Sequence, residues 1–317
     1  MEAKTVTIGR ELQLAMDIAC CSGVGDALSD KSHPCSKIVR LQLGDTSGES
    51  DRQRPEPWMG NLENSLVLFI SSNPSINDDE KPFGENFPTF QWSDEDSAQF
   101  FVNRVGDASD PMHVTFNHAT KRNFITRAMD GEYRNGLKNP NKPQHTWSRI
   151  HERALELLGP KANPSQNYAI TEIVHCKSRK EVGVKEASAF CIDQWMNPIM
   201  IISPARILII VGGQVRDRYA KPVLAVSPDF GSGDNYIGLS QKERSLRDIV
   251  LTDIGGSKRL TIFNYHPASW ESKCPQKFEV IFGSKVVAWL RSVALGGVPI
   301  PESQAELQAA IEMLFEG

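Results

Sequence analysis

The chain has 317 residues, of which 40% are hydrophobic and 23% are charged, and its formal net charge is −4. These proportions exclude a disordered chain and are ordinary for a globular protein that buries a substantial core. No apolar run is long enough to cross a bilayer, and the N-terminus lacks the pattern of a secretory signal. We therefore expect a cytoplasmic protein with no membrane partner.

A weakly negative chain can still bind nucleic acid, because binding needs only a local basic surface. Two clusters of basic residues meet that condition, although each could equally be ordinary solvated charge. The first comprises Lys177, Arg179, Lys180 and Lys185, and the second comprises Lys273, Lys277 and Lys285.

Residues 1–60 form the first predicted unit. They contain a helix-like stretch, three of the six cysteines and a polar linker from Gly44 to Pro57. The main unit, residues 61–295, carries four apolar, β-branched segments typical of buried parallel strands. These are Leu66–Ser71, Tyr168–Val174, Arg206–Gly212 and Leu260–Tyr265.

Helical patterns separate these strands, at Trp147–Leu158, Lys185–Ile202 and Phe278–Val293. The alternation predicts an α/β fold, specifically a three-layer α/β/α sandwich around a central, mostly parallel four-stranded sheet. A long insertion of partly helical character spans residues 89–146. The tail, residues 296–317, is predicted to be a helix that begins with capping-box spacing at Ser303–Glu306.

Ligands of such sheets bind beyond the carboxyl ends of the strands. Each predicted strand is followed there by polar or glycine-rich residues. Ser72-Asn73-Pro74-Ser75 follows the first strand, Glu172 and His175-Cys176 lie at the second, Gly212-Gly213 at the third, and His266-Pro267-Ala268-Ser269 at the fourth. We therefore expect these side chains to form one site.

The Ser-Asn-Pro-Ser and His-Pro-Ala-Ser segments resemble the two signature motifs of the uracil-DNA glycosylase superfamily. The resemblance extends from about Trp58 to Leu290, and the middle section, from Ile170 to Gly213, is most similar to the iron–sulfur-containing branch. It implies a monofunctional DNA N-glycosylase, a hydrolase that flips a pyrimidine out of DNA and leaves an abasic site. DNA is then the expected partner, and we expect a monomer.

The resemblance implies that Asn73 and His266 are the catalytic residues. The amide of Asn73 cannot act as a strong base, but it can hold a water beneath the sugar carbon. His266 would donate a hydrogen bond to the pyrimidine O2 as negative charge develops on the departing base. The alternatives are a turn residue before Pro74 and a histidine that only caps a strand end.

Further roles follow from the same resemblance. Phe87, or less favourably Phe83, would stack on the flipped base, with Pro74 and Ser75 lining the base pocket. Trp270 would fill the space that the base leaves in the helix. Ser269 and Lys273 complete the predicted DNA contact. A plain core position is the competing interpretation for each aromatic ring.

Glu172 departs from the uracil-excising relatives, which commonly carry asparagine at this position. A carboxylate cannot donate to the O4 acceptor of uracil, whereas it accepts well from the N4 amine of cytosine, and a protonated Glu can serve N3. The favoured substrate is therefore a modified cytosine. Some phage-defence glycosylases of the superfamily excise glucosylated hydroxymethylcytosine, and the insertion could shape such a pocket. The alternative is that Glu172 points into the core or pairs with a lysine.

The resemblance also implies that four cysteines bind a 4Fe-4S cluster. Cys176 and Cys191 have the family's approximate spacing, and Cys21 (or Cys20) with Cys35 would supply the other two ligands. The separation of Cys21 and Cys35 is wider than is usual in the branch. A structural Zn or buried, unligated thiols are the alternatives. Cys274 is left over.

Two other functions compete with excision of a modified cytosine on the same scaffold. One is a uracil-DNA glycosylase of base excision repair, and the other is a non-catalytic reader of modified bases. An unrelated nucleotide-binding protein that uses Gly212-Gly213 at a phosphate is less favoured, because the spacing of a phosphate-binding fingerprint is missing.

Overall fold

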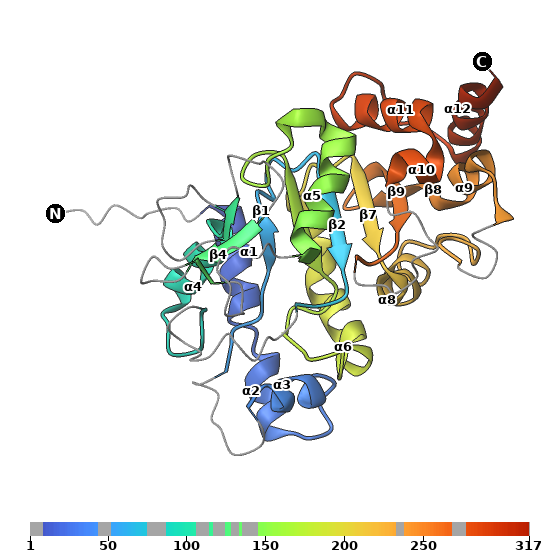
Figure 1. The fold of residues 1–317 in the computed structure, drawn as a ribbon. Helices are drawn as coiled ribbons and strands as arrows, with labels where there is room; N and C mark the ends of the chain where they lie inside the picture. Colours follow the sequence, from blue (N-terminus) through green and yellow to red (C-terminus); the bar gives the residue numbers. More distant parts are fainter. Residues whose placement is uncertain are drawn as a thin grey trace.

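The structure is a computed structural model of the chain. It describes residues 9–43, 52–74, 87–105, 114–116, 124–127, 133–134, 145–232, 238–267 and 277–316. Within these ranges the chain is an α/β protein built on a six-stranded, mostly parallel sheet (Figure 1).

The strands of this sheet are arranged in the order β1-β6-β2-β7-β9-β8. The four central strands run parallel, and the two edge strands run antiparallel to their neighbours. The bounds are β1 Trp58–Gly60, β2 Val67–Ser71, β6 Tyr168–Glu172, β7 Ile207–Val211, β8 Ile249–Ile254 and β9 Ser257–Asn264.

The four predicted strands are confirmed as the central strands, but the expectation of a four-stranded sheet is wrong, because both edge strands were missed. β8 and β9 form a hairpin whose turn, Gly255-Gly256, has positive φ at both residues. Two glycines between strands are a hairpin signal that the sequence does carry. β1 has only three residues, too few for a periodic pattern.

Helices cover both faces of the sheet. Alternate residues of β2 show the two faces: Val67 and Phe69 belong to one core, and Leu68 and Ile70 belong to the other. Helices α5 (His145–Leu158), α10 (Phe278–Phe282), α11 (Ser284–Ala294) and α12 (Gln304–Glu316) pack on the first face. The second face is covered by α1 (Arg10–Ala19), α2 (Gly23–Ser29), α3 (Ser36–Leu43), α6 (Val184–Cys191) and α7 (Asn197–Ile202).

Two predicted helices contain interruptions. The helix expected over 185–202 is α6 and α7 joined by a π-helical segment, Ile192–Met196, which ends just before Pro198. Proline lacks the backbone N–H that a regular helix would use there, so the bonding pattern shifts. The helix expected over 278–293 is broken by Gly283, whose φ is +89°.

The N-terminal helices share the core of the sheet and do not pack separately from it. Ile18 of α1 and Val39 of α3 are buried in the same cluster as Leu68. Trp58, near the predicted boundary at residue 60, is fully buried within that cluster. The first predicted unit therefore lies against the main one throughout its described part.

The predicted insertion contains helix α4 (Asp94–Val102), which packs against α1, and a small antiparallel sheet. The strands of that sheet are β3 Val114–Phe116, β4 Phe124–Arg127 and β5 Tyr133–Arg134. The strand character of this region was not predicted.

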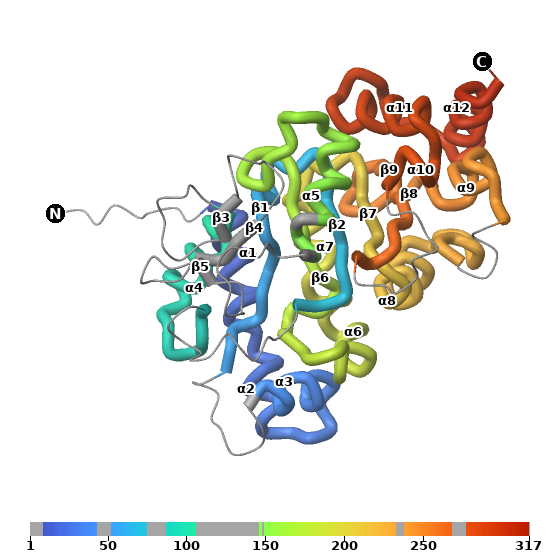
Figure 2. Tube along the Cα trace, viewed as in Figure 1, coloured from blue at the N-terminus to red at the C-terminus, as the bar shows by residue number. Residues whose placement is uncertain are grey.

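The remaining helices complete the molecule. A short helix, α8 (Gly213–Val215), continues into a π-helical turn, Arg216–Ala220, and α9 (Gln241–Asp248) begins with a capping box between Ser240 and Glu243. At α12 the predicted cap bond from Glu306 N–H to Ser303 Oγ is present at 3.2 Å. Figure 2 traces α12 beside α9 and α11, at the far end of the molecule from α2 and α3. Among the described residues, no helix is both long and apolar enough to cross a membrane.

Gly183 fixes the approach of α3 to α6. Its φ is +85°, and a Cβ built on it would lie 2.6 Å from the backbone nitrogen of Ile38. We expect Gly183→Ala to destabilise the protein by ~3 kcal/mol or more, since backbone strain and a backbone clash combine. Gly256→Ala is the matched control, because Gly256 also has positive φ but open space around it; it should cost about 1 kcal/mol. Urea unfolding of both variants measures the difference, and equal losses would contradict the proposed clash.

Candidate active site

The carboxyl ends of β2 and β6 are joined beyond the strands. The amide of Ile173 donates to Ser71 O at 2.9 Å, and the amide of Val174 donates to Ser72 O at 3.1 Å. Further on, the amide of Ser178 donates to Pro74 O at 3.0 Å. In Figure 1 the arrowheads of β2 and β7 point toward this end of the molecule, where α2, α3 and α6 lie. The two segments therefore run side by side at the edge where the sequence predicted a site.

Asn73 lies directly after β2 and is half-buried. Its side-chain Nδ2 donates to Pro74 O at 2.7 Å. This bond fixes the orientation of the amide and uses a donor, whereas the carbonyl oxygen Oδ1 is the acceptor that holding a water would require. Pro74 itself is buried.

His266 follows β9 and is also half-buried. The close approach of Gly212 holds it in place: a Cβ on Gly212 would lie 3.0 Å from the Cβ of His266. Gly212 has φ +88°, and its amide donates to Asn264 O at 2.8 Å. Because Gly212 has no side chain, His266 can pack directly against it. Burial lowers the pKa of His266, and the charge of Glu181 opposes this effect.

Glu172 is the last residue of β6 and is buried. Burial raises the pKa of its carboxyl to about 8, although Arg104, a weak bond from Ser71 and Lys177 all act in the opposite direction. Ser71 Oγ lies 3.4 Å from Oε1, and Oε2 has no hydrogen-bond partner within the described residues. The carboxyl is therefore largely protonated near neutral pH, and it is able to donate.

Two buried cations, Arg104 and Lys177, act on Glu172, and both lie beside the buried carboxyl of Glu56. Arg104 forms an ion pair with Glu56, and Lys177 Nζ lies 3.9 Å from Glu56 Oε2. Burial lowers the pKa of Arg104 to about 10, so the guanidinium is still charged at neutral pH. His175 accompanies the group: its Nδ1 lies 2.8 Å from Glu56 O, and burial lowers its pKa to about 3, which makes it neutral. With Glu172 protonated, this group has two cations and one anion.

Phe87 is buried in an aromatic cluster and is not an exposed ring. It makes edge contacts with Phe100 and Phe101, each with ring centroids 5.6 Å apart. The ammonium of Lys177 lies 3.7 Å from the ring centre. A base could stack on Phe87 only if Lys177 moved away from that face. The ring does lie beside the charged group that contains Glu172, since Arg104 also contacts it at 5.5 Å.

The structure brings four cysteines together. Cys21, Cys35, Cys176 and Cys191 are all buried and all free. The thiols of Cys35 and Cys191 share a hydrogen bond, which lowers the pKa of Cys35 and raises that of Cys191. Burial raises the pKa of Cys176, and the charges of Cys35 and Cys21 raise it further. The predicted ligands are therefore neighbours, although the described residues contain no group of three or more His, Cys, Asp or Glu side chains that could hold a single metal ion.

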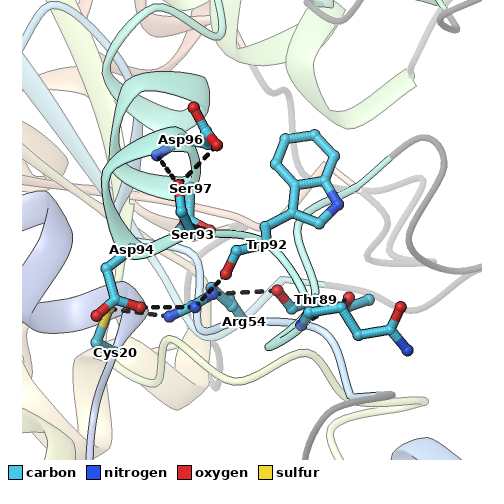
Figure 3. Close-up of polar contacts among 9 residues, drawn as sticks. Cys20, Arg54, Thr89, Trp92, Ser93, Asp94, Asp96 and Ser97 are labelled. Atoms are coloured by element: carbon cyan, nitrogen blue, oxygen red, sulfur yellow. Dashed lines mark hydrogen bonds and ion pairs between the residues drawn. The ribbon is translucent and has the colours of Figure 1, made fainter.

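Cys20 belongs to a different group of side chains, drawn in Figure 3. Arg54 Nη1 lies 2.9 Å from Cys20 Sγ, and Arg54 Nη2 pairs with Asp94 Oδ1 at 2.7 Å. Burial raises the pKa of Cys20 to about 11. Of the two adjacent cysteines, Cys21 is therefore the one that lies with the other three.

Several predicted residues lie outside the described ranges. They are Ser75, Phe83, Ser269, Trp270, Lys273 and Cys274. Of the first basic cluster, Arg179, Lys180 and Lys185 are exposed, but Lys177 is buried and does not belong to the surface. Lys277 and Lys285 of the second cluster are exposed.

Three residues of the site were not predicted. Glu56 lies in the stretch interpreted as a linker, and Arg104 lies in the insertion. Neither residue follows a predicted strand, so the position of strand ends does not indicate them. Glu181 was hidden within a basic stretch, where its only signal is the opposite charge.

Comparison with models of known protein families and with curated protein sequences finds no match for this chain. The resemblance to the uracil-DNA glycosylase superfamily therefore rests on the two sequence motifs alone.

The raised pKa of Glu172 has a measurable effect on stability. The pKa is about 8 in the folded protein and 4.5 ordinarily, so the stabilising contribution is fully present below pH 4.5 and is lost as the pH rises through 8. Relative to its effect at pH 5, Glu172→Gln should gain ~4 kcal/mol over the wild type by pH 9, given about 1.4 kcal/mol per pKa unit. Urea unfolding at the two pH values measures this.

The matched control is Glu186→Gln, which removes an exposed carboxyl paired with Lys37 at 2.9 Å. An exposed pair contributes little, so this variant should show no gain at pH 9. An equal response of Glu172→Gln at both pH values would show that the buried carboxyl is already ionised at pH 5.

Proposed function

We propose that this protein is a DNA glycosylase that hydrolyses the N-glycosidic bond of a flipped-out, modified cytosine and leaves an abasic site. The observation that carries the proposal is that Asn73, Glu172 and His266 each lie at the carboxyl end of a parallel strand, at the same edge of the sheet. Helices on both faces of that sheet are also what the three-layer α/β/α architecture of the uracil-DNA glycosylase superfamily requires.

Cleavage of an N-glycosidic bond passes through an oxocarbenium-like sugar, while the departing base gains negative charge. Two tasks follow: a water must be held beneath the sugar carbon, and the leaving base must be stabilised. Asn73 can hold the water through Oδ1, because its Nδ2 is fixed by Pro74 O. His266 can donate to O2 of the base in a site where partial burial strengthens the hydrogen bond.

Glu172 can accept a hydrogen bond from the N4 amine of cytosine in either protonation state, whereas its ionised state has no donor for O4 of uracil. A neutral carboxyl donates through its hydroxyl and accepts through its carbonyl oxygen, which matches the N3 acceptor and N4 amine of cytosine. Uracil presents an N3–H donor and an O4 acceptor, which a neutral carboxyl can also serve with its two oxygens exchanged, whereas an ionised carboxylate would face O4 with a second acceptor. The pKa of about 8 makes the matching form available near neutral pH.

The charges behind Glu172 suit the departing base. Arg104 and Lys177 outnumber Glu56 when Glu172 is protonated, so the buried group has an excess positive charge. A cytosine anion is a poor leaving group, and positive charge in a poorly hydrated pocket lowers the cost of forming it.

We also propose that Cys21, Cys35, Cys176 and Cys191 bind a 4Fe-4S cluster. Four buried thiols that interact with one another are the donor set that such a cluster needs. The cluster would separate Cys35 and Cys191, which interact directly in this structure. It would tie the segment between α1 and α3 to the loop after β6, and no part of the reaction depends on it.

The abasic-site assay tests the function. DNAs that contain uracil, hypoxanthine, cytosine, hydroxymethylcytosine or glucosylated hydroxymethylcytosine, single- and double-stranded, are incubated with the protein and then treated with hot alkali. Strand cleavage confined to a modified cytosine is the expected result. Cleavage of uracil alone would make the protein a uracil-DNA glycosylase of base excision repair. Binding of a modified base without cleavage of any DNA would make it a base reader.

Variants of the proposed catalytic residues distinguish excision by this protein from excision by a contaminating enzyme. Asn73→Ala and His266→Ala should each lower single-turnover excision by about 100-fold or more, the typical loss when one such group is removed, with unchanged far-UV circular dichroism. Glu172→Asn should shift preference toward uracil, because an amide offers both a donor to O4 and an acceptor to N3–H. Wild-type rates in both alanine variants would refute the site.

Cysteine variants test the cluster. The purified wild type should contain iron and acid-labile sulfide and absorb visible light, and Cys191→Ser should lose both. Cys20→Ser is the matched control and should retain them, because Cys20 lies with Arg54 and Asp94. Stoichiometric zinc in a colourless wild type would replace the cluster with a structural ion.

A further inference from the structure

We propose that the loop between β6 and α6 binds the phosphates of a DNA strand, through the exposed cations Arg179 and Lys180 of the loop and Lys185 of α6. This inference rests on the proposed function, because it names the surface that would hold the strand at the proposed site. The loop belongs to neither of the two motifs.

Two hydrogen bonds attach this loop to the end of β2, one on each side of Asn73. Just before Asn73, Ser72 Oγ donates to Glu181 Oε1 at 2.6 Å. Just after Asn73, the carbonyl of Pro74 accepts from the amide of Ser178 at 3.0 Å. The loop residues between these two bonds therefore lie alongside Asn73.

The residues between the two bonds are Arg179 and Lys180, and both are exposed. The loop itself holds their backbone in one conformation. Ser178 Oγ donates to Val182 O at 2.7 Å, and the amide of Val182 donates to Arg179 O at 3.1 Å. Lys180 has φ +51°, a left-handed conformation that its surroundings must maintain. A loop fixed in this way loses little backbone freedom when it binds a ligand, and this favours affinity.

The exposed charge of this surface is positive, although the net charge of the whole chain is −4. Lys185, in the first turn of α6, is exposed and adds a third cation. Lys37 of α3 pairs with Glu186 at 2.9 Å, so these two charges largely cancel. The loop and the first turn of α6 then carry three exposed cations and the carboxylate of Glu181.

The position of these cations suits the phosphates of a strand whose nucleotide is bound at Asn73. A flipped nucleotide stays joined to its strand, so the phosphates on either side of its sugar remain at the edge of the site. Arginine and lysine bind such phosphates whatever the base sequence. Lys177 belongs to the interior and not to this surface, because it is buried against the ring of Phe87.

Fluorescence anisotropy with unmodified DNA tests the surface without any excision. A labelled duplex and the matching single strand are titrated with Arg179→Ala, Lys180→Ala and Lys185→Ala over a range of salt concentrations. Each variant should bind more weakly whatever the sequence. The slope of log affinity against log salt should become shallower by about 0.9 for the duplex and about 0.7 for the single strand, the effect of one lost phosphate contact.

Two further variants are the controls. Lys161→Ala removes an exposed lysine that lies shortly before β6, at the opposite edge of the sheet, and it should leave affinity and slope unchanged. Lys180→Arg keeps the charge and should keep the wild-type slope. Wild-type affinity and slope in all three alanine variants of the surface would overturn the inference, and so would an equal loss in Lys161→Ala.

Kinetics on whichever DNA the wild type cleaves test the consequence. Phosphate contacts hold the strand equally before and during bond cleavage, so the three alanine variants should raise KM severalfold and change kcat by less than about twofold. A loss confined to kcat would overturn the inference.

The two proposals fail in different ways. A wild type that cleaves DNA while the three alanine variants bind it normally would overturn the role of the loop and leave the enzyme in place. A wild type that binds DNA through the loop and cleaves none would overturn the proposed reaction and support the binding surface.

Discussion

The site depends on the hydrogen bonds that continue the pairing of β2 and β6 past the last strand residues. Bonds from Ile173 and Val174 to the carbonyls of Ser71 and Ser72 force the two segments to leave the sheet together. In most parallel sheets the chain diverges at the strand ends, and their residues then separate. Here Asn73 and Glu172 are held at neighbouring positions. The loop that follows β6 is attached to the end of β2 by the hydrogen bond from Ser72 to Glu181.

The continued pairing of β2 and β6 holds charged residues, among them Glu172, in a buried place that apolar side chains could otherwise fill. An isolated buried carboxylate costs several kcal/mol, and the structure reduces the cost for Glu172 by favouring its protonated form. Glu56 takes the opposite solution and stays paired with Arg104 and Lys177. Two buried carboxyls with the same cationic neighbours therefore differ in charge because their surroundings differ, a pattern typical of sites that bind or react.

The sequence predicted the parts of this arrangement that follow from periodicity and strand order. The four central strands were predicted because each is a run of apolar residues buried on both faces. The places of Asn73 and His266 were predicted because parallel strands end at one edge, whereas their catalytic roles came from the resemblance of the two motifs and stay predictions. The edge strands, Arg104 and Glu56 were missed. A three-residue strand has no periodicity, and a buried arginine in an insertion is indistinguishable from a surface one until the chain is folded. Lys177 was wrongly assigned to a basic surface cluster, because nothing in the sequence distinguishes a buried lysine from an exposed one.

Strain at the loop after β6 points in the same direction as the chemistry. Two successive residues with positive φ lower stability, and neither is needed to close the sheet. If the loop only connected β6 to α6, glycines at positions 180 and 181 would make the same turn at lower cost, as Gly183 does two residues later. A side chain is required at position 181 only if it acts, and the hydrogen bond that it accepts from Ser72 is the action that the structure shows. The loop is therefore better explained as part of the site than as a connection between two elements.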